Sequence, residues 1–444
     1  TEQLAVPPLG PGESAELEQP TPRRTDRSGA GEAWWTVRAL LAEDTAWAPA
    51  GHEVAWTQFA AAAQSAGPGE SATLGSADKG SIESAEPGRW TAPRGVAHTP
   101  RLAEGGMIVL GVGTFDAADG RLRLLNGNVV QGPVLDVWRA PIDNDRGMNR
   151  FPDGQLERRW REAGLHRMRH RVERVTVGED TLTVVTRVAP ASSDLALRTV
   201  YSWTAVGESL RLELQVEPAG DWRLPLPRLG VRLGLCPTLD TVEWYGGGPG
   251  EAYPDSRAAS RIGRYRSTVD DLQTRYVRPQ ENGARADVRW AELRRTDGTG
   301  IRLAGAPPFW LTVRPWSTRA LDEAEHTHEL RRDPAVLWVH LDHGLHGLGS
   351  HACGPEVLPA FRQMAAPAAF SVTLSALGVR DRRADREATE QLLRAPDRDT
   401  MADPDSSDGS PGSAMSDGSA MSDDFGDPFD LSGPGLRGHG SLGG

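Results

Sequence analysis

The chain has 444 residues, enough for two or three domains that each bury a core. Its formal net charge of -12 argues against a basic face, so neither nucleic acid nor an anionic membrane is expected as a partner. Hydrophobic residues make up only 38%, while glycine and proline number 50 and 33, so part of the chain is expected to be disordered. No apolar run reaches the roughly 18 residues that a membrane-spanning helix needs.

Two strands are predicted near the start of the chain. The segments "EAWWTVRALL" (32–41) and "HEVAWTQFAAAA" (52–63) have strand patterns and are separated by turn-forming residues. Two or three strands cannot bury both faces of a β-sandwich. We therefore expect residues 1–63 to be the closing part of a small sandwich, in a chain that is either truncated at its start or completed by a partner.

The remaining chain divides by composition. Residues 64–98 are rich in Gly, Ser, Ala, Glu and Pro without periodicity, which predicts a flexible linker. Residues 99–376 contain many short strand patterns separated by turn signals, and only "QLERRWREAGL" (155–165) has helical spacing. Because no βα alternation occurs, we predict an all-β fold with one large antiparallel β-sandwich and no (β/α)8 barrel. Residues 377–444 are polar and low in complexity, typical of a disordered acidic tail.

The segment "LDVWRAPIDNDRG" (135–147) places a tryptophan, an arginine and three short polar residues close together. Asp143, Asn144 and Asp145 are similar to the start of a calcium loop, but the alternating spacing and the distal glutamate are missing. A tight structural turn is favoured, in which Arg139 pairs with a carboxylate and Trp138 enters the core.

A second candidate region is "LWVHLDHGLHGLGSHACGPEVLP" (337–359), which is rich in histidine and glycine. A zinc site needs three or four converging ligands, yet His340 and His343 would face opposite sides of a single strand. No metal is therefore expected. The glycines of the loop favour a surface or ligand contact at close backbone approach.

Two further motifs combine polar and aromatic residues. In "WYGGGPGEAYPDS" (244–256) neither a helix start nor a Walker lysine follows the glycines, so a phosphate site is excluded. Its Glu251, Tyr253 and Asp255 either bind a sugar or order a long loop, and the sequence leaves both open.

The motif "YVRPQENG" (276–283) contains Arg278, Glu281 and Asn282, which are predicted to form an internal polar network that anchors a loop. No pair of carboxylates suited to glycoside hydrolysis can be nominated anywhere in the chain on physical grounds.

Four motifs, taken in order, resemble the C-terminal domain of the large family 2 β-galactosidases, a galactose-mutarotase-like supersandwich. They are "WRAPIDNDRG" (138–147), "WYGGGPGEAYPDSR" (244–257), "YVRPQENG" (276–283) and "HGLHGLGSHACGPEVLP" (343–359). Residues 34–59 are similar to the end of the immunoglobulin-like domain that precedes this sandwich. The resemblance covers roughly residues 5–376.

The resemblance implies that this chain is the C-terminal portion or small subunit of a β-galactosidase acting on terminal β-D-galactosides such as lactose. In the family, the catalytic glutamates and the magnesium ligands belong to a barrel domain that has no counterpart in this sequence. The chain alone is therefore expected to be inactive, without catalytic residues or a cofactor of its own. The expected partners are the N-terminal catalytic portion or large subunit, a galactoside, and further copies in an oligomer.

A stand-alone carbohydrate-binding module without hydrolytic activity is the alternative. The two cysteines, Cys236 and Cys353, are far apart in sequence, which favours a reducing cytoplasm.

In the family, a late loop of the sandwich contributes an aromatic residue beside the sugar pocket. The matching loop here, "GLGSHACGPE" (347–356), contains no tryptophan. The substrate-binding candidates that follow from the resemblance are His346, Ser350, His351 and Cys353. The residues expected to have structural roles are Trp138, Arg139, Asp143, Asn144, Asp145, Glu251, Tyr253, Arg278, Glu281 and Asn282.

Overall fold

The computed structural model describes residues 3–17, 32–61, 97–147, 155–191, 193–351 and 357–378. The predicted linker (64–98) and tail (377–444) therefore lie almost entirely outside the described residues. Cys353 also lies outside them.

The two N-terminal strands are confirmed. Strand β1 (Trp34–Leu40) pairs antiparallel with β2 (Glu53–Ala60) in a two-stranded sheet of their own. In the described part of residues 1–63 these are the only strands, too few to enclose a core.

The region predicted as a large sandwich forms one antiparallel sheet of 16 strands, which confirms the all-β fold class. Its strands are β3 (Arg101–Ala103), β4 (Met107–Leu110), β5 (Gly113–Asp116), β6 (Leu122–Leu125), β7 (Asn128–Asp136), β8 (Arg169–Val177), β9 (Thr181–Ala189), β10 (Ala196–Val206), β11 (Ser209–Ala219), β12 (Arg228–Leu235), β13 (Thr241–Gly248), β14 (Arg261–Thr268), β15 (Arg285–Arg294), β16 (Gly300–Arg314), β17 (Leu337–Leu345) and β18 (Ala368–Leu377).

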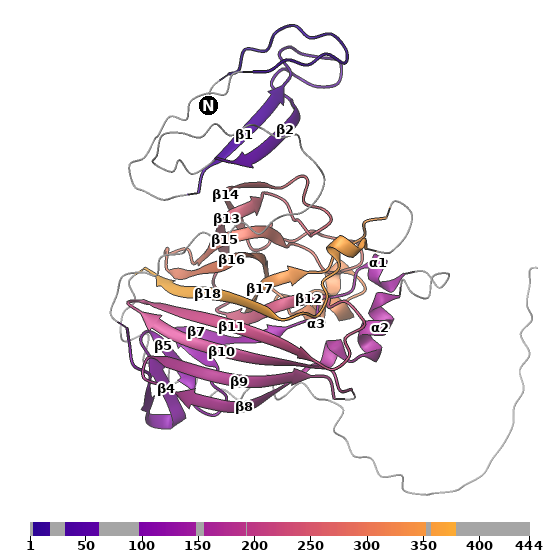
Figure 1. Ribbon diagram of the computed structural model, residues 1–444. Coiled ribbons are helices and arrows are strands. Elements are labelled where there is room, and N and C mark those ends of the chain that lie inside the picture. Colours follow the sequence, from indigo (N-terminus) through magenta and orange to yellow (C-terminus); the bar gives the residue numbers. More distant parts are fainter. Residues whose placement is uncertain are drawn as a thin grey trace, which may run out of the picture. The chain divides into compact units, whose positions relative to one another are not determined.

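The hydrogen-bonded order along the main path is β3-β4-β5-β6-β7-β12-β17-β16-β18-β11-β10-β9-β8. Strand β16 is the branch point, because it also pairs with β15, which continues to β13 and β14. The long strands β8 to β11 and β18 lie side by side across one layer (Figure 1).

Strict alternation of side chains explains the inner face of this layer. In β11 the residues Leu210, Leu212, Leu214 and Val216 are buried, while the intervening positions are more exposed. The other layer of the sheet, which includes β7, covers these buried side chains. The Tyr201 hydroxyl of β10 accepts a hydrogen bond from the Leu135 N–H of β7 at 2.8 Å, which connects the two layers directly.

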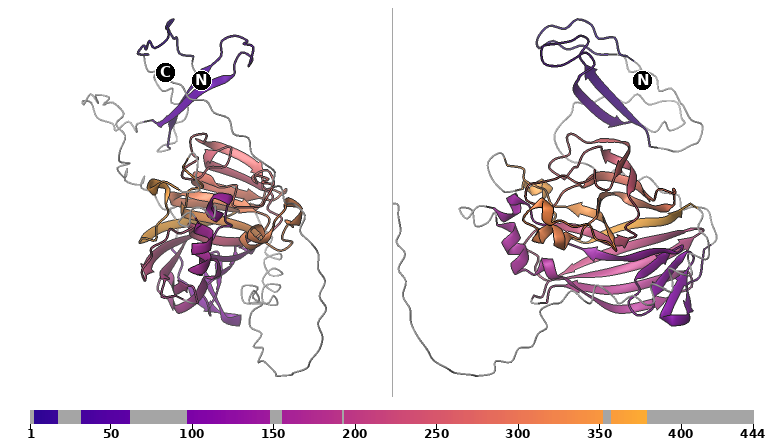
Figure 2. Two further views of the ribbon diagram at one scale, coloured as in Figure 1. Left: turned by 90° about the vertical axis from the view of Figure 1, so that its right-hand side faces the viewer. Right: turned by 180° about the vertical axis from the view of Figure 1, so that it is seen from behind.

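The three short α-helices among the described residues gather at one end of the sheet (Figures 1 and 2). Helix α2 (Leu156–Glu162) confirms the helical prediction for residues 155–165. Helices α1 (Asp143–Arg146) and α3 (Thr318–Glu323) were not predicted, because four and six residues are too few to show a helical period. Among the described residues the 3₁₀ turns include Glu104–Gly106, Leu165–Arg167, Thr327–Glu329 and Pro359–Phe361.

Among the described residues, none of the helices has the length and apolar character needed to cross a membrane.

Candidate functional site

The loop that follows β17 is the centre of the candidate site, and residues 346–351 are its described part. His346 starts the loop inside the protein, with its side chain only 1% exposed. Its ring lies edge-on to Trp160 at 5.8 Å, and its Nδ1 accepts a hydrogen bond from the Gln363 N–H at 3.3 Å. Burial and the neighbouring Arg139 charge lower the pKa of His346 to about 3, so the ring is neutral.

Asp255 holds the outer half of this loop. Its carboxylate accepts hydrogen bonds from the Leu348 N–H (2.8 Å), the Gly349 N–H (2.9 Å) and the Ser350 hydroxyl (2.9 Å). Burial alone would raise the pKa of Asp255, but these hydrogen bonds to the charged form outweigh it and lower the pKa. Asp255 is thus an ionised anchor that fixes three consecutive residues.

The "WRAPIDNDRG" motif supports the same loop from the other side. The Arg139 guanidinium is fully buried, donates to the His346 carbonyl at 2.6 Å and to the Gly347 carbonyl at 3.1 Å, and forms an ion pair with Asp145 at 2.8 Å. Asp145 also accepts from the Ile142 N–H at 3.0 Å, which fixes the start of α1.

The remaining motif residues complete this support. Asn144 donates from its amide to the Leu348 carbonyl at 3.0 Å. The Asp143 backbone N–H donates to Gln280 at 2.9 Å, while its carboxylate is 70% exposed. Trp138 is buried in the core. The polar triplet therefore braces a loop, and its carboxylates do not converge on one point as calcium ligands would.

The loop at residues 276–283 is tied down by Glu251. This carboxylate accepts from the Tyr276 hydroxyl and from the Gly283 N–H, both at 2.7 Å. Asn282 accepts from the Thr274 N–H at 3.1 Å. The sequence left two roles open for Glu251, sugar binding and the ordering of a loop. The contacts seen here order the loop.

Glu281 is the centre of a buried polar cluster. It pairs with Arg314 at 2.8 Å and Arg228 at 3.1 Å, and the buried Tyr253 hydroxyl donates to it at 3.4 Å. Although burial opposes ionisation, the two guanidinium groups lower the pKa of Glu281 to about 2. The prediction of an internal position is wrong for Arg278, which lies exposed on the outer side of the loop.

Two further members of this cluster, His340 and Asp342, were not recognised as a site. The neutral His340 ring accepts from Arg228 at 2.6 Å, and burial lowers its pKa to about 3. Asp342 lies two residues further along β17, fully buried. The polar residues His340 and Asp342 within the apolar pattern of β17 were the available signal, but Arg228, which contacts both, lies on β12, 112 residues before His340.

The zinc alternative finds no support in the described residues, where no group of three or more His, Cys, Asp or Glu side chains is placed to hold a metal ion. His340 lies in the buried cluster, whereas the His343 ring stacks on Phe370 at 5.4 Å. His351 is at the surface.

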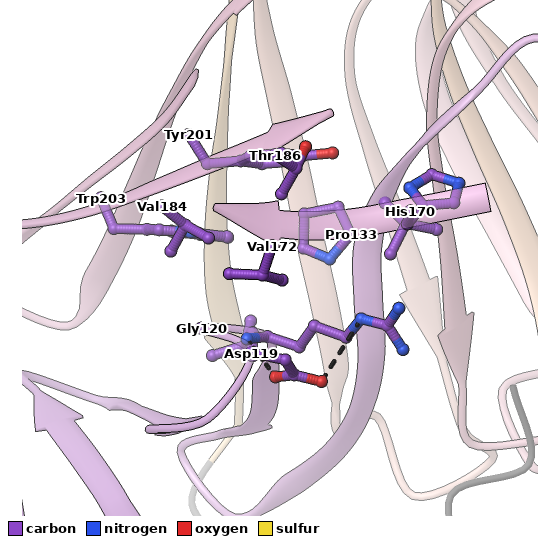
Figure 3. Close-up of a pocket in the computed structure, with 12 residues that line it drawn as sticks. Asp119, Gly120, Pro133, His170, Val172, Val184, Thr186, Tyr201 and Trp203 are labelled. Carbon is purple, nitrogen blue, oxygen red and sulfur yellow. Dashed lines mark hydrogen bonds and ion pairs between the residues drawn. The ribbon is translucent and has the colours of Figure 1, made fainter. Parts of the chain in front are cut away.

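A small cavity lies between the two layers of the sandwich, beside Thr186, Tyr201 and His170 (Figure 3). Its volume of about 20 Å³ is enough for a single water molecule and not for a sugar. This cavity is therefore part of the core packing.

The sequence comparisons agree with this architecture. Residues 112–374 match the family model described as "Beta galactosidase small chain", and residues 1–62 match "Beta-galactosidase, domain 4". The first match covers more than half of the chain. The chain therefore belongs to the β-galactosidase small chain family.

Three relatives show how much of a larger protein is matched. The β-galactosidase of Arthrobacter sp. (strain B7) is 35% identical over 375 residues, which are 80% of this chain and 34% of that protein. β-Galactosidase 2 of Enterobacter cloacae is 31% identical, over 76% of this chain and 31% of that protein. The Kluyveromyces lactis enzyme is 28% identical, over 55% and 24%. The chain thus spans about a third or less of the relatives it matches.

Solved structures that the chain matches include a putative aldose 1-epimerase from Escherichia coli K12, at 12% identity and a TM-score of 0.30, covering 63% of this chain and 98% of that one. A galactose mutarotase related enzyme from Lactobacillus acidophilus matches at 9% identity and a TM-score of 0.34, over 64% and 99%. The fold assignment itself rests on the strand pairing and not on this likeness.

Proposed function

We propose that this chain forms one wall of the galactoside pocket in a β-galactosidase that hydrolyses terminal β-D-galactosides such as lactose. The observation that carries the proposal is the rigid support of residues 346–351. Two other segments converge on this segment, residues 138–147 through Arg139 and Asn144 and the loop after β13 through Asp255. The described part of the segment ends in the partly exposed Ser350 and the exposed His351. A substrate-positioning wall needs such support, because small displacements cost much of the rate.

The catalytic carboxylates belong, in this proposal, to the rest of the enzyme. Retaining glycoside hydrolysis needs two carboxylates about 5 Å apart, one of which protonates the leaving oxygen. Three of the buried or half-buried acids near the candidate loop already have partners: Asp145 pairs with Arg139, Asp255 with backbone amides, and Glu281 with Arg314. A magnesium ion would likewise belong to the catalytic portion.

The contribution of His346 and of Ser350 would then differ. His346 lies behind the wall and positions it, whereas Ser350 and His351 are the described residues that could reach a sugar. The substrate-binding roles of these residues and of Cys353 stay predictions.

The test is complementation. The full chain is mixed with a catalytic portion of the Arthrobacter relative that ends where the matched region begins, and hydrolysis of a chromogenic galactoside is followed. We expect activity in the mixture and none in either part. His351→Ala should raise the KM of the complex, with Glu213→Ala, on the distant strand β11, as the control.

Two outcomes would overturn the proposal. One is turnover of about 10 s⁻¹ by the chain alone, a typical enzymatic rate. The other is a stable complex of the two parts with no gain in activity. Sugar binding by the isolated chain together with that second outcome would favour the carbohydrate-binding module.

A cytoplasmic location and an oligomeric state are also part of the proposal. The free thiol of Cys236 agrees with a reducing compartment. The size of the complemented complex, measured by light scattering, tests the oligomer.

A further inference from the structure

A second, larger cavity lies where strands β13 to β15 face β1, and its volume is about 300 Å³. Its polar lining includes Arg257, Ser260, Asp287 and Arg289, and Trp34 of β1 supplies an aromatic wall. None of these residues takes part in supporting the loop at 346–351. This volume lies at the lower end of the range for small-molecule sites, so it fits one ring rather than a long chain.

The polar side chains of this cavity are held in place by one another. Asp287 sits in an irregular stretch of β15, between Arg285 and Val288, with φ at 50°. This backbone geometry, uncommon outside glycine, turns the strand locally, and the Asp287 carboxylate forms an ion pair with Arg257. Arg289 donates to the Asp287 carbonyl at 2.5 Å. The donors and the acceptor are therefore fixed before any ligand enters.

The wall that carries Trp34 is attached to the main sheet by specific contacts. The Gln58 side chain of β2 donates to the Ile262 carbonyl at 2.9 Å and accepts from the Ile262 N–H at 2.7 Å. The Arg289 guanidinium lies 5.7 Å from the centre of the Trp34 ring and donates to Glu32 at 2.8 Å.

The charge balance of the cavity identifies the class of ligand. Arg257 is neutralised by Asp287, and Arg289 is neutralised by Glu32, so the lining has no excess charge that would attract an ion. It offers guanidinium donors, a carboxylate acceptor and a hydroxyl next to an indole. A pyranose ring has both hydroxyl groups and an apolar C–H face, which matches this mixture.

We propose that this cavity binds one neutral pyranose ring. The Asp287 carboxylate accepts from ring hydroxyls, Arg257 and Arg289 donate to them, and Trp34 contacts the C–H face. Binding would tie β1 to the β13–β15 region, because its contacts come from both. The proposal does not depend on the galactoside wall, since it concerns other residues and needs no catalytic partner.

Isothermal titration of the full chain with D-galactose and with D-glucose tests this inference. We expect saturable binding in the millimolar range by one or both sugars, because a single exposed ring makes few contacts. Sorbitol, which has the hydroxyls but no ring, should give no saturable heat. Sodium sulfate should also give no saturable heat if the site is neutral. This titration therefore distinguishes an anion site from a sugar site.

Variants connect the signal to the cavity. Asp287→Asn removes the charged acceptor while keeping the size and the tolerated positive φ, and should weaken sugar binding at least about tenfold. Trp34→Ala should do the same, whereas Trp47→Ala, on the same hairpin and 66% exposed, should leave binding unchanged. Circular dichroism melts show whether each variant is folded.

No saturable heat up to about 100 mM of either sugar would overturn the inference. So would binding that folded Asp287→Asn and Trp34→Ala proteins retain at full strength, and so would a response to sulfate or sorbitol equal to that of the sugars. Complementation of the catalytic portion is read separately, so failure of one proposal is distinguishable from failure of the other.

Discussion

In the buried cluster Glu281 pairs with Arg228 and Arg314, and the neighbouring Asp136 carboxylate lies 3.3 Å from the His340 ring nitrogen and 3.7 Å from the Arg232 guanidinium. The unusual acid of the cluster is Asp342. Among the described residues neither of its oxygens has a hydrogen-bond partner, and the nearest guanidinium nitrogen, of Arg228, is 3.5 Å away. Burial is the main cause that raises the pKa of Asp342 to about 7.

This pKa predicts how stability depends on pH. The unfolded chain releases the Asp342 proton near its ordinary value of about 4, whereas the folded chain keeps it up to about 7. Between these values the folded state binds more protons, so this group lowers the free energy of unfolding as pH rises from about 4 to about 7. Asp342→Asn, which imitates the neutral form, should therefore be more stable than the natural chain at pH 8, by a few kcal/mol at most.

Urea unfolding across pH 4 to 8 measures the difference, which should shrink towards pH 4. Glu281→Gln is the matched control from the same cluster and should have the opposite sign. Its folded pKa is lowered to about 2, so it contributes stability at neutral pH, and its removal leaves two buried guanidiniums without their partner. A stability gain from Asp342→Asn that does not change with pH would contradict this interpretation.

At the scale of elements, the loop at 346–351 depends on contacts from other loops rather than on its own sequence. Gly349 shows this, because an added Cβ would come within 2.3 Å of the Asn144 amide nitrogen. A side chain at this position would therefore displace the Asn144 side chain from its contact with the loop.

Asp255 is the testable anchor of this loop. In Asp255→Asn the charged carboxylate becomes a neutral amide, which is a weaker acceptor. The amide NH2 group also takes the place of one of the two oxygens that accept backbone N–H groups in the natural chain. We expect amide hydrogen exchange at Leu348 and Gly349 to accelerate by at least about tenfold, while exchange in β17 stays unchanged. Asp333→Asn, which removes a comparable carboxylate that accepts backbone N–H bonds in another loop, is the control. Unchanged exchange at residues 348 and 349 would show that Arg139 and Asn144 suffice.

At the scale of the whole molecule, strands β3 to β18 form one continuous sheet over one large core cluster. Strand β16 joins its parts, since residues 300–306 pair with β18 and residues 310–314 pair with β17. A defect in β16 is therefore expected to affect all of these strands together.

Leu303→Ala in β16 tests this continuity. Leu303 is fully buried, so the substitution should cost about 2–5 kcal/mol. Far-UV circular dichroism and tryptophan fluorescence should move to the same lower urea midpoint. Leu102→Ala, at a position that is 71% exposed, should shift neither probe measurably. Separate midpoints for the two probes in Leu303→Ala would indicate that the sheet unfolds in independent parts.

The strands, helix α2 and the inward faces were predictable because they depend on local rules. Alternation in β10 and β11 determines which side chains are buried, and the turn residues between strands set where each strand ends. Even the pairing of Arg139 with a carboxylate was predictable, since Asp145 is only six residues away. The sequence did not predict helices α1 and α3, because such short helices do not show the repeating apolar pattern of a helix.

What only the tertiary structure decided is which distant strands and loops meet. Arg139 reaches a carbonyl 207 residues away, and the cluster around Glu281 collects side chains from β12, β16 and β17. The exposure of Arg278 and the burial of His346 follow from the same long-range packing. Side-chain alternation fixes the two faces of each strand but not its neighbours, because strand order is set by how the whole sheet closes over its core.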